Sequence, residues 1–111
     1  MDIFDWSVED YVTSDGKDPF EEWINSLKDK KTKEIIYARL DRLESGNFGL
    51  CRHVGNGVHE LRIFFGPGYR VYFGTHKRKI VLILTGGDKS SQTRDIQKAK
   101  QYWEDYQRRM Q

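Results

Sequence analysis

The chain has 111 residues, a single cysteine and a net charge of +2. This length is typical of one domain with a modest hydrophobic core, so we expect residues 1–111 to fold as a single domain. One cysteine excludes an internal disulfide, and the lack of any run of roughly 20 apolar residues excludes a membrane span. The first six residues also lack the basic region of a secretion signal. We therefore expect a cytoplasmic protein without a membrane partner.

The charge is divided unevenly along the sequence. Residues 1–51 hold 7 Lys and Arg against 12 Asp and Glu, whereas residues 52–111 hold 12 against 5. A basic half is typical of a surface that binds a polyanion or an acidic protein. Chance segregation of solvated charges would give the same asymmetry, so charge alone leaves both interpretations open.

The first predicted elements are a strand and the start of a helix. Apolar and polar residues alternate over residues 3–13, as in a half-buried strand, although Asp10 interrupts the pattern. Asp18 and Pro19 then predict a helix start, because aspartate caps free backbone N–H groups and proline is tolerated in the first turn. The strand would place four apolar side chains on one face: Phe4, Trp6, Val8 and Val12.

The spacing of apolar residues predicts two amphipathic helices. The first helix has one apolar stripe, made of Phe20, Trp23, Ile24 and Leu27. The second is predicted over residues 32–44 and ends at Gly46, since glycine is the usual residue after a helix. Its inward-facing side chains are Ile35, Ile36, Leu40 and Leu43. The link between the helices is short, so we expect an antiparallel helical hairpin.

Strands follow the helical hairpin. A short edge strand is predicted over residues 50–54, and two longer strands over residues 59–65 and 69–73 are joined by a tight Gly-Pro-Gly turn. The next strand, residues 79–85, contains an unbroken apolar run, so it should lie centrally with both faces covered.

A loop over residues 86–92 leads into the last helix, which Ser90 or Ser91 should cap. Its apolar positions recur at helical spacing: Ile96, Ala99, Trp103, Tyr106 and Met110. The complete order predicts an α+β fold, with an antiparallel sheet of four or five strands, an N-terminal helical hairpin packed on one face, and a C-terminal helix. The other face of the sheet should be partly open.

Two arginines stand out on the open face. Side chains alternate along a strand, so Arg62 and Arg70 share the face opposite Leu61 and Val71. Adjacent guanidinium groups repel unless an anion lies over them, and their planar donors match the geometry of phosphate. The pair therefore predicts an anion-binding site. The alternative is a structural network with Glu60 and an acidic residue of the first strand.

Four stretches of the sequence carry a family resemblance: GVHELRIFFGPGYRVYF, IVLILTGGDKSSQ, RDIQKAKQYWEDY and LESGNFG. On these residues the chain resembles the RelE/ParE superfamily of toxins from bacterial type II toxin-antitoxin pairs, closest to the HigB-like branch. The resemblance covers nearly the whole chain and implies a RelE-like fold. It also implies a bacterial or prophage-encoded toxin that enters the ribosomal A site and cleaves mRNA. The implied partners are the ribosome, mRNA and a cognate helix-turn-helix antitoxin, through which alone the toxin would reach operator DNA.

The resemblance also implies site residues. Arg70 falls on the strand arginine that follows Gly-Tyr in the family's ribonucleases, Arg62 on a basic residue of the preceding strand, and Lys89 on the basic position before the last helix. Metal-independent RNA cleavage needs cations that stabilise the charge on the pentacoordinate phosphate, and the arginines suit this task. Tyr72, Gln92 and Lys77 are expected to contact RNA. Neither a cofactor nor a metal is expected, because Asp88 and Asp95 are too isolated to form a metal site.

The chain departs from the family pattern at two positions. The best-known ribonuclease of the family has a further lysine where this chain has Glu60, and a tyrosine near the position of Asp95. Another group must therefore transfer protons, and His76 is the first candidate, ahead of His59 and Tyr72.

Three functions remain open from the sequence. The arginine pair and Lys89 favour a ribosome-dependent, metal-independent mRNA endoribonuclease that inhibits translation until an antitoxin neutralises it. The alternatives are a ParE-like inhibitor of DNA gyrase, and a catalytically degenerate homologue that only binds its antitoxin.

Overall fold

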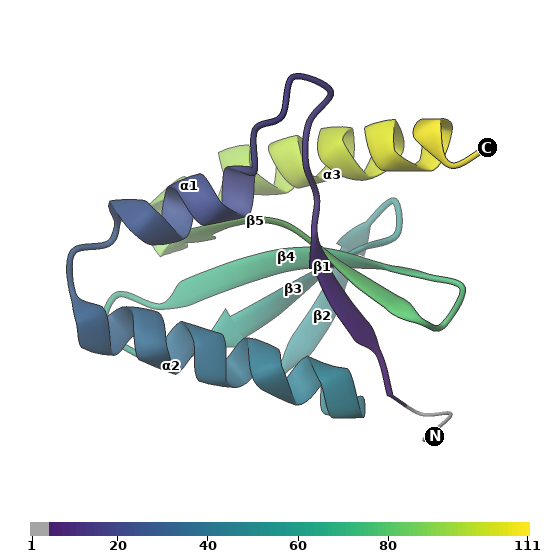
Figure 1. Cartoon of the computed structure of the whole chain (residues 1–111). Helices are drawn as coiled ribbons and strands as arrows, with labels where there is room; N and C mark the ends of the chain where they lie inside the picture. Colours follow the sequence, from purple (N-terminus) through teal and green to yellow (C-terminus); the bar gives the residue numbers. More distant parts are fainter. Residues whose placement is uncertain (1–4) are drawn as a thin grey trace.

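A computed structural model describes residues 5–111, which form one five-stranded sheet with helices on both faces (Figure 1). The strands are β1 (Ser7–Asp10), β2 (Cys51–Gly55), β3 (Val58–Ile63), β4 (Tyr69–His76) and β5 (Ile80–Asp88). The helices are α1 (Pro19–Ser26), α2 (Lys30–Asp41) and α3 (Gln92–Arg109), with 3-10 turns at Arg42–Ser45 and Lys89–Ser91. The strand order is β1-β5-β4-β3-β2, and all neighbours are antiparallel except β1 and β5. The predicted α+β fold is confirmed.

The helices α1 and α2 cover one face of the sheet, as predicted (Figure 1). Asp18 caps α1 by accepting a hydrogen bond from the Glu21 backbone N–H at 2.9 Å, and Asp29 caps α2. Gly46 ends the helical segment with φ of +81°, a conformation that glycine adopts without strain. The core on this face joins α1 and α2 to alternate residues of the sheet: Leu61, Ile63, Val71, Phe73, Val81 and Ile83.

The helix α3 packs on the other face of the sheet, mainly over β5 and partly over β4. Ala99 and Trp103 of α3 are buried there against Tyr72 and Leu82. The β5 strand is therefore covered on both faces, as its unbroken apolar run predicts. The helix also reaches the end of β2 and the start of β3, where Val54 and Val58 pack in the same core as Ala99 and Trp103.

The N-terminal strand is shorter than expected, and residues 3 and 4 of the prediction lie outside the described residues. The placement of Val12 on the inner face is wrong, because its side chain is 43% exposed while that of Tyr11 is only 3% exposed. Tyr11 stacks on Tyr102, with the two ring centroids 5.0 Å apart, and donates a hydrogen bond to Asp105 at 2.6 Å. The alternating pattern predicted that the Tyr11 side chain points to solvent, but α3 covers that side of the strand.

The β5 strand is longer than expected. Residues 86–88 were predicted as a loop, yet they pair with the start of β4, where Arg70 lies opposite Gly87. The pairing of β4 with β5 is irregular between Tyr72 and Phe73, where a bulge shifts the register by one residue. The extension matters for function because it carries the Lys89–Ser91 turn to the side of Arg70.

Gly74 sits beneath Trp103, and a Cβ atom at Gly74 would lie 2.5 Å from the indole ring. We predict that Gly74→Ala lowers the free energy of unfolding by about 1–3 kcal/mol through overpacking. Urea unfolding should show a smaller cost for the same change in a Trp103→Leu background. An equal cost in both backgrounds would contradict the packing explanation.

Candidate anion-binding site

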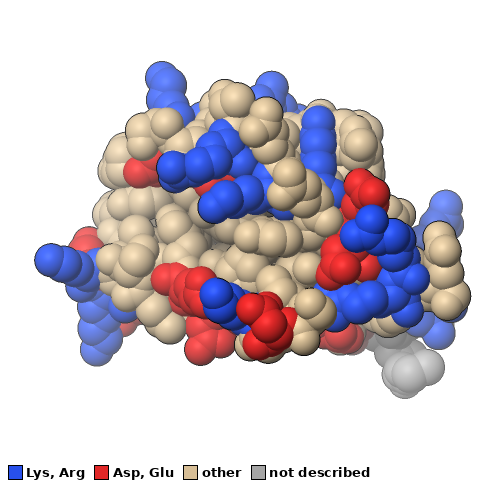
Figure 2. Space-filling model, turned by 90° about the horizontal axis from the view of Figure 1, so that it is seen from above, with Lys and Arg blue, Asp and Glu red and all other residues tan. Residues whose placement is uncertain are grey.

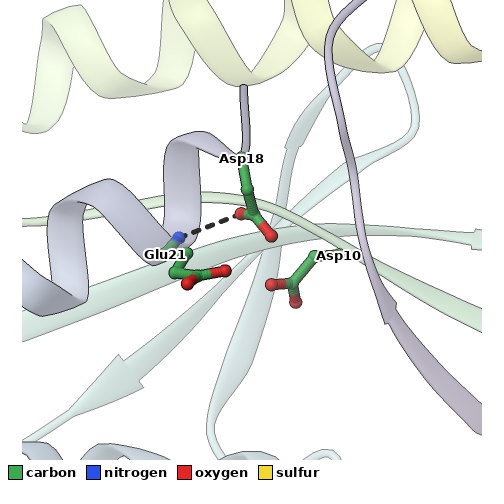
Figure 3. A group of neighbouring side chains, drawn as sticks. All are labelled: Asp10, Asp18 and Glu21. Carbon is green, nitrogen blue, oxygen red and sulfur yellow. Dashed lines mark hydrogen bonds between the residues drawn. The ribbon is translucent and has the colours of Figure 1, made fainter. Parts of the chain in front are cut away.

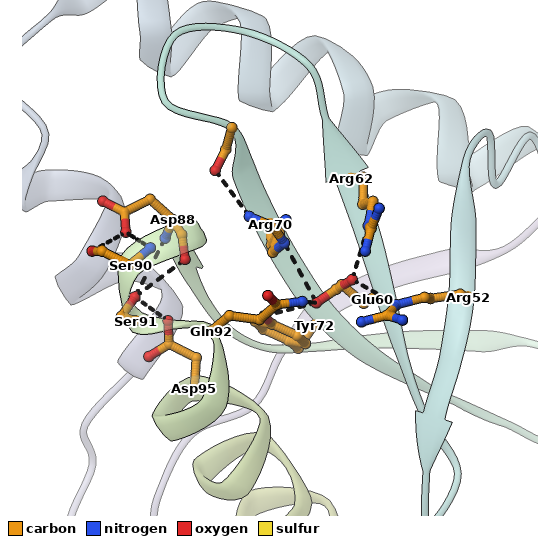
Figure 4. Close-up of polar contacts among 11 residues, drawn as sticks. Arg52, Glu60, Arg62, Arg70, Tyr72, Asp88, Ser90, Ser91, Gln92 and Asp95 are labelled. Carbon is orange, nitrogen blue, oxygen red and sulfur yellow. Dashed lines mark hydrogen bonds and ion pairs between the residues drawn. The ribbon is translucent and has the colours of Figure 1, made fainter.

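Arg62 and Arg70 lie directly opposite each other on β3 and β4, on the face away from α1 and α2. Glu60 occupies the same face two residues before Arg62, and its side chain is fully buried. Five side chains from β2, β3, β4 and α3 point at the Glu60 carboxylate: Arg52, Arg62, Arg70, Tyr72 and Gln92 (Figure 4). We call these six residues the Glu60 cluster.

The two oxygens of Glu60 have different partners. Oε1 accepts hydrogen bonds from Arg52 Nε at 3.0 Å and Arg62 Nε at 3.1 Å. Oε2 accepts from the Tyr72 hydroxyl at 3.0 Å and from Gln92 Nε2 at 2.9 Å. Arg70 Nε lies 3.6 Å from Oε2, within ion-pair distance. Side chains of β2, β3 and β4 therefore all contact the Glu60 carboxylate or carry it.

The structural network considered as an alternative is present in part. Glu60 does pair with Arg62 and Arg70, but β1 lies at the opposite edge of the sheet and supplies no acidic partner to them among residues 5–111. One carboxylate neutralises only one of three guanidinium groups, so the Glu60 cluster keeps two formal positive charges. The network and an anion-binding surface therefore coexist.

The arginines meet Glu60 through Nε and leave their terminal nitrogens for other contacts. Arg70 Nη1 donates to the carbonyl oxygen of Gly68 at 3.3 Å. The Arg62 side chain makes its one hydrogen bond within residues 5–111 through Nε. The exposed fractions of the side chains fall from 54% for Arg52 to 34% for Arg62 and 11% for Arg70. Arg70 Nε is buried and has no hydrogen-bond partner within residues 5–111. Glu60 thus orients the guanidinium groups, while some of their N–H donors remain without a partner within residues 5–111.

Burial and charge set the protonation states within the Glu60 cluster. Burial alone would raise the pKa of Glu60, but the hydrogen bonds from Gln92, Arg62, Arg52 and Tyr72 hold it below its ordinary value. Burial raises the pKa of Tyr72 far above its ordinary value, and the adjacent Glu60 charge adds to this effect. Glu60 is therefore ionised at neutral pH and Tyr72 is a neutral hydrogen-bond donor.

A groove of about 430 Å³ borders the Glu60 cluster. Its lining consists of three cationic side chains, Arg62, Arg70 and Lys89, and the loop of residues 64–68 between β3 and β4. Lys89 is exposed, and Asp88 caps its 3-10 turn by accepting a hydrogen bond from the Ser90 backbone N–H at 2.8 Å. Ser91 is the N-cap residue of α3, as predicted, but its side chain makes no capping hydrogen bond. The structure does bring together the three predicted cations.

Other predicted site residues lie elsewhere. His76 is at the far end of β4, roughly 20 Å along the strand from Arg70, and contacts Tyr106 with a ring separation of 5.6 Å. Lys77 is in the turn beyond His76, with φ of +53°. His59 lies on the opposite face of the sheet, stacked on Phe73. No histidine of the described chain lines the groove.

Tyr72 and Gln92 were predicted to contact RNA, but in the structure both side chains bind Glu60. Tyr72 is fully buried, and Gln92 uses its side-chain amide nitrogen on Glu60. Arg52 was not among the predicted site residues, and Glu60 was expected only as a structural partner of the arginines or as a departure from a family pattern. Arg52 and Glu60 are paired in register between β2 and β3, which places them on one face, and no local pattern of the sequence specifies this register.

An acidic cluster lies on the face covered by α1 and α2. The carboxylate oxygens of Asp10, Asp18 and Glu21 come within 4.8 Å of one another (Figure 3). Burial, the hydrogen bond to Asp18, and the charges of Asp18 and Glu21 raise the pKa of Asp10 to about 7. The Asp10 carboxyl therefore holds its proton to a higher pH than an ordinary aspartate does.

The charge asymmetry of the sequence is also an asymmetry in space. In Figure 2, acidic side chains gather along the lower part of the view and at the right, while Lys and Arg side chains lie above them and at both sides. The acidic cluster belongs to the N-terminal half, and all three arginines of the Glu60 cluster belong to the C-terminal half. No helix within residues 5–111 has the length and apolar character needed to cross a membrane.

Comparison with known proteins identifies relatives. Residues 22–104 match the family described as Phage derived protein Gp49-like (DUF891). The matched segment contains the whole Glu60 cluster and Lys89. An uncharacterized protein of Haemophilus influenzae is 47% identical over 81 residues, which cover 73% of this chain and 82% of that protein.

We predict that Glu60→Gln destabilises the fold by about 3–5 kcal/mol, because it leaves buried guanidinium charge without a counterion. Denaturant unfolding at pH 7 should show this loss. The matched control is Glu104→Gln, an exposed partner of Arg108, which should cost at most about 0.5 kcal/mol. Equal stabilities of the two variants would contradict the role given to Glu60.

The Glu60 cluster also predicts a pH dependence. Because the folded pKa of Glu60 is lowered, its stabilising contribution is complete above the ordinary value of 4.5 and is lost as the pH falls through the folded pKa. Unfolding measured from pH 7 to pH 3 should show this acid-dependent loss in the wild type and a weaker one in Glu60→Gln. Parallel curves would be inconsistent with an ionised Glu60.

The acidic cluster predicts the opposite pH dependence. A raised folded pKa favours the protonated form, so Asp10 destabilises the fold increasingly as the pH rises from 3.8 through about 7. We expect Asp10→Asn to stabilise the protein at pH 8 by about 1 kcal/mol, a value discounted for the solvent exposure of Asp10. Thermal unfolding at pH 8 and pH 5 checks this, since the gain should shrink at pH 5.

Proposed function

The chain belongs to the phage-derived Gp49-like family, which is related to the RelE/HigB-like toxins of type II toxin-antitoxin systems, and on that premise we propose that it is a toxin that cleaves mRNA on the ribosome. One observation carries the proposal. Arg62 and Arg70 face each other across β3 and β4, and both line a groove shared with Lys89. Three cations around one groove, only partly neutralised by Glu60, suit a phosphodiester backbone.

The cleavage step follows from general RNA chemistry. The 2′-oxygen forms a bond to phosphorus while the bond from phosphorus to the 5′-oxygen breaks, leaving a 2′,3′-cyclic phosphate and a 5′-hydroxyl. Negative charge builds up on the two non-bridging oxygens during this exchange. Arg62 and Arg70 would donate N–H groups to these oxygens, and the orientation imposed by Glu60 means that little reorganisation is needed.

Lys89 is proposed to act at the leaving group. Its ammonium group has three donors and lies at the exposed side of the groove, in a turn held by Asp88. It can therefore stabilise or protonate the departing 5′-oxygen. Gln92 and Tyr72 are proposed as positioning residues, because both donate hydrogen bonds to Glu60 and neither faces the groove.

A second candidate function has a specific observation in its favour. Neither histidine nor tyrosine lines the groove within the described chain, so the usual proton acceptor for the 2′-hydroxyl is missing there. This favours either a ribosomal group as the acceptor or a toxin that acts by binding, as a ParE-like gyrase inhibitor or an antitoxin-binding homologue would. We favour the ribosome-dependent nuclease because the groove presents three cations.

The proposed partners follow from this function. The toxin would act in the bacterial cytoplasm on ribosome-bound mRNA, without a metal ion. A cognate antitoxin, expected to be a helix-turn-helix protein, would neutralise it and provide its contact with operator DNA.

We predict that Lys89→Ala lowers mRNA cleavage by about 10- to 100-fold without affecting folding, since Lys89 is exposed and lies outside the Glu60 cluster. Arg70→Lys should lower cleavage further, because an ammonium cannot replace the planar guanidinium. Primer extension on a reporter mRNA after induction measures the effect. Arg108→Ala, an exposed basic residue near the end of α3, is the control and should cleave normally.

The same cultures should carry a reporter of the SOS response. Intact mRNA together with an induced SOS response would reject the nuclease function and support the gyrase inhibitor. Intact mRNA without an SOS response, together with normal antitoxin binding, would leave only the antitoxin-binding homologue.

A further inference from the structure

Phe64 is an exposed aromatic residue at the end of the cationic groove. Its side chain is 75% exposed, more than any of the other large apolar side chains exposed within residues 5–111: Val12, Tyr37, Leu50 and Met110. It lines the groove together with Arg62, Arg70 and Lys89. An exposed apolar side chain is ordinary by itself, but this one lies within reach of an anion-binding surface.

The loop that carries Phe64 is held in place by several contacts. Phe65 packs against the core on the α1 and α2 face, and its backbone N–H donates to Ile63 at 3.0 Å. The Gly68 backbone N–H donates to Phe65 at 3.0 Å, and Arg70 Nη1 binds the Gly68 carbonyl. Phe64 follows the last residue of β3, and its exposed side chain lines the groove with Arg62. Phe64 is therefore presented on a fixed loop, which lowers the entropic cost of using it in binding.

We propose that Phe64 is a stacking platform for one unpaired base of the RNA strand whose phosphates lie on Arg62, Arg70 and Lys89. This inference rests on the proposed function and specifies its substrate as single-stranded at that point. Aromatic side chains beside a cationic groove are the usual combination in single-strand binding, because each base offers a flat apolar face. A base within a duplex is already stacked and would not be available to the ring.

The chemistry of the ring also predicts the type of selectivity. A phenyl group has no hydrogen-bond donor or acceptor, so Phe64 reads the size of the stacked base and not its edge. Purines have the larger flat surface and should be preferred at the stacked position over pyrimidines. A protein partner is the less suitable occupant, because the remaining side chains that line the groove around Phe64 are mainly cationic or glycine and proline.

The test uses the full chain in a purified bacterial translation system, with cleavage sites mapped on mRNAs that vary the nucleotides around one cut. We expect Phe64→Leu to reduce cleavage roughly tenfold and to remove a purine preference at one fixed position beside the cut, since a base-stacking contact is worth about that factor. Phe64→Trp should retain both rate and preference. Leu50→Ala, which removes an exposed apolar side chain outside the groove, should behave like wild type.

Each outcome decides between the two proposals. If Phe64→Leu cleaves at the wild-type rate with the wild-type preference, the stacking role is rejected while the nuclease stands. If Phe64→Leu weakens only antitoxin binding, the residue anchors a protein and the stacking role is again rejected. If neither the wild type nor Lys89→Ala cleaves mRNA, the nuclease function is rejected and the stacking role with it.

Discussion

The arrangement of this end of the molecule depends on one buried carboxylate. Glu60 is fully buried, yet it remains ionised because four side chains donate hydrogen bonds to its two oxygens: Gln92, Arg62, Arg52 and Tyr72. Removing a carboxylate from water is costly, and a network of this kind stabilises the fold only if its hydrogen bonds are well made. Here it also aligns guanidinium groups that would otherwise repel one another. Because one carboxylate faces three guanidinium groups, the assembly keeps positive charge at the surface of the groove.

Much of this architecture could be predicted from the sequence because local patterns decide it. The two-residue period of β3 and β4 placed Arg62 and Arg70 on one face, and Asp18 and Gly46 marked helix ends through their capping chemistry. The sequence could not show which residues meet across strands. Arg52 reaches Glu60 only through the register of β2 against β3, which an irregularity near Gly55 adjusts.

Other errors arose where long-range packing overrides local preference. The strand β5 continues through Gly86 and Gly87, which have low strand propensity, because Trp23 and Asp95 pack where their side chains would be. His76 was expected to transfer protons in the site, yet β4 continues as far as His76 and carries it to the end of the strand away from the groove. Alternation specifies a face and not a distance along the strand. A site requires both, and only the three-dimensional structure supplies the second.

The most direct measurement is side-chain NMR of the arginine guanidinium groups during titration with a short single-stranded RNA whose 2′-hydroxyls are methylated to prevent cleavage. The proposal predicts that the Nη signals of Arg62 and Arg70 shift on binding, while the Nε signal of Arg52 stays that of a group bonded to Glu60. Shifts confined to arginines away from the groove, such as Arg108, or loss of the Glu60 contacts on binding, would contradict it.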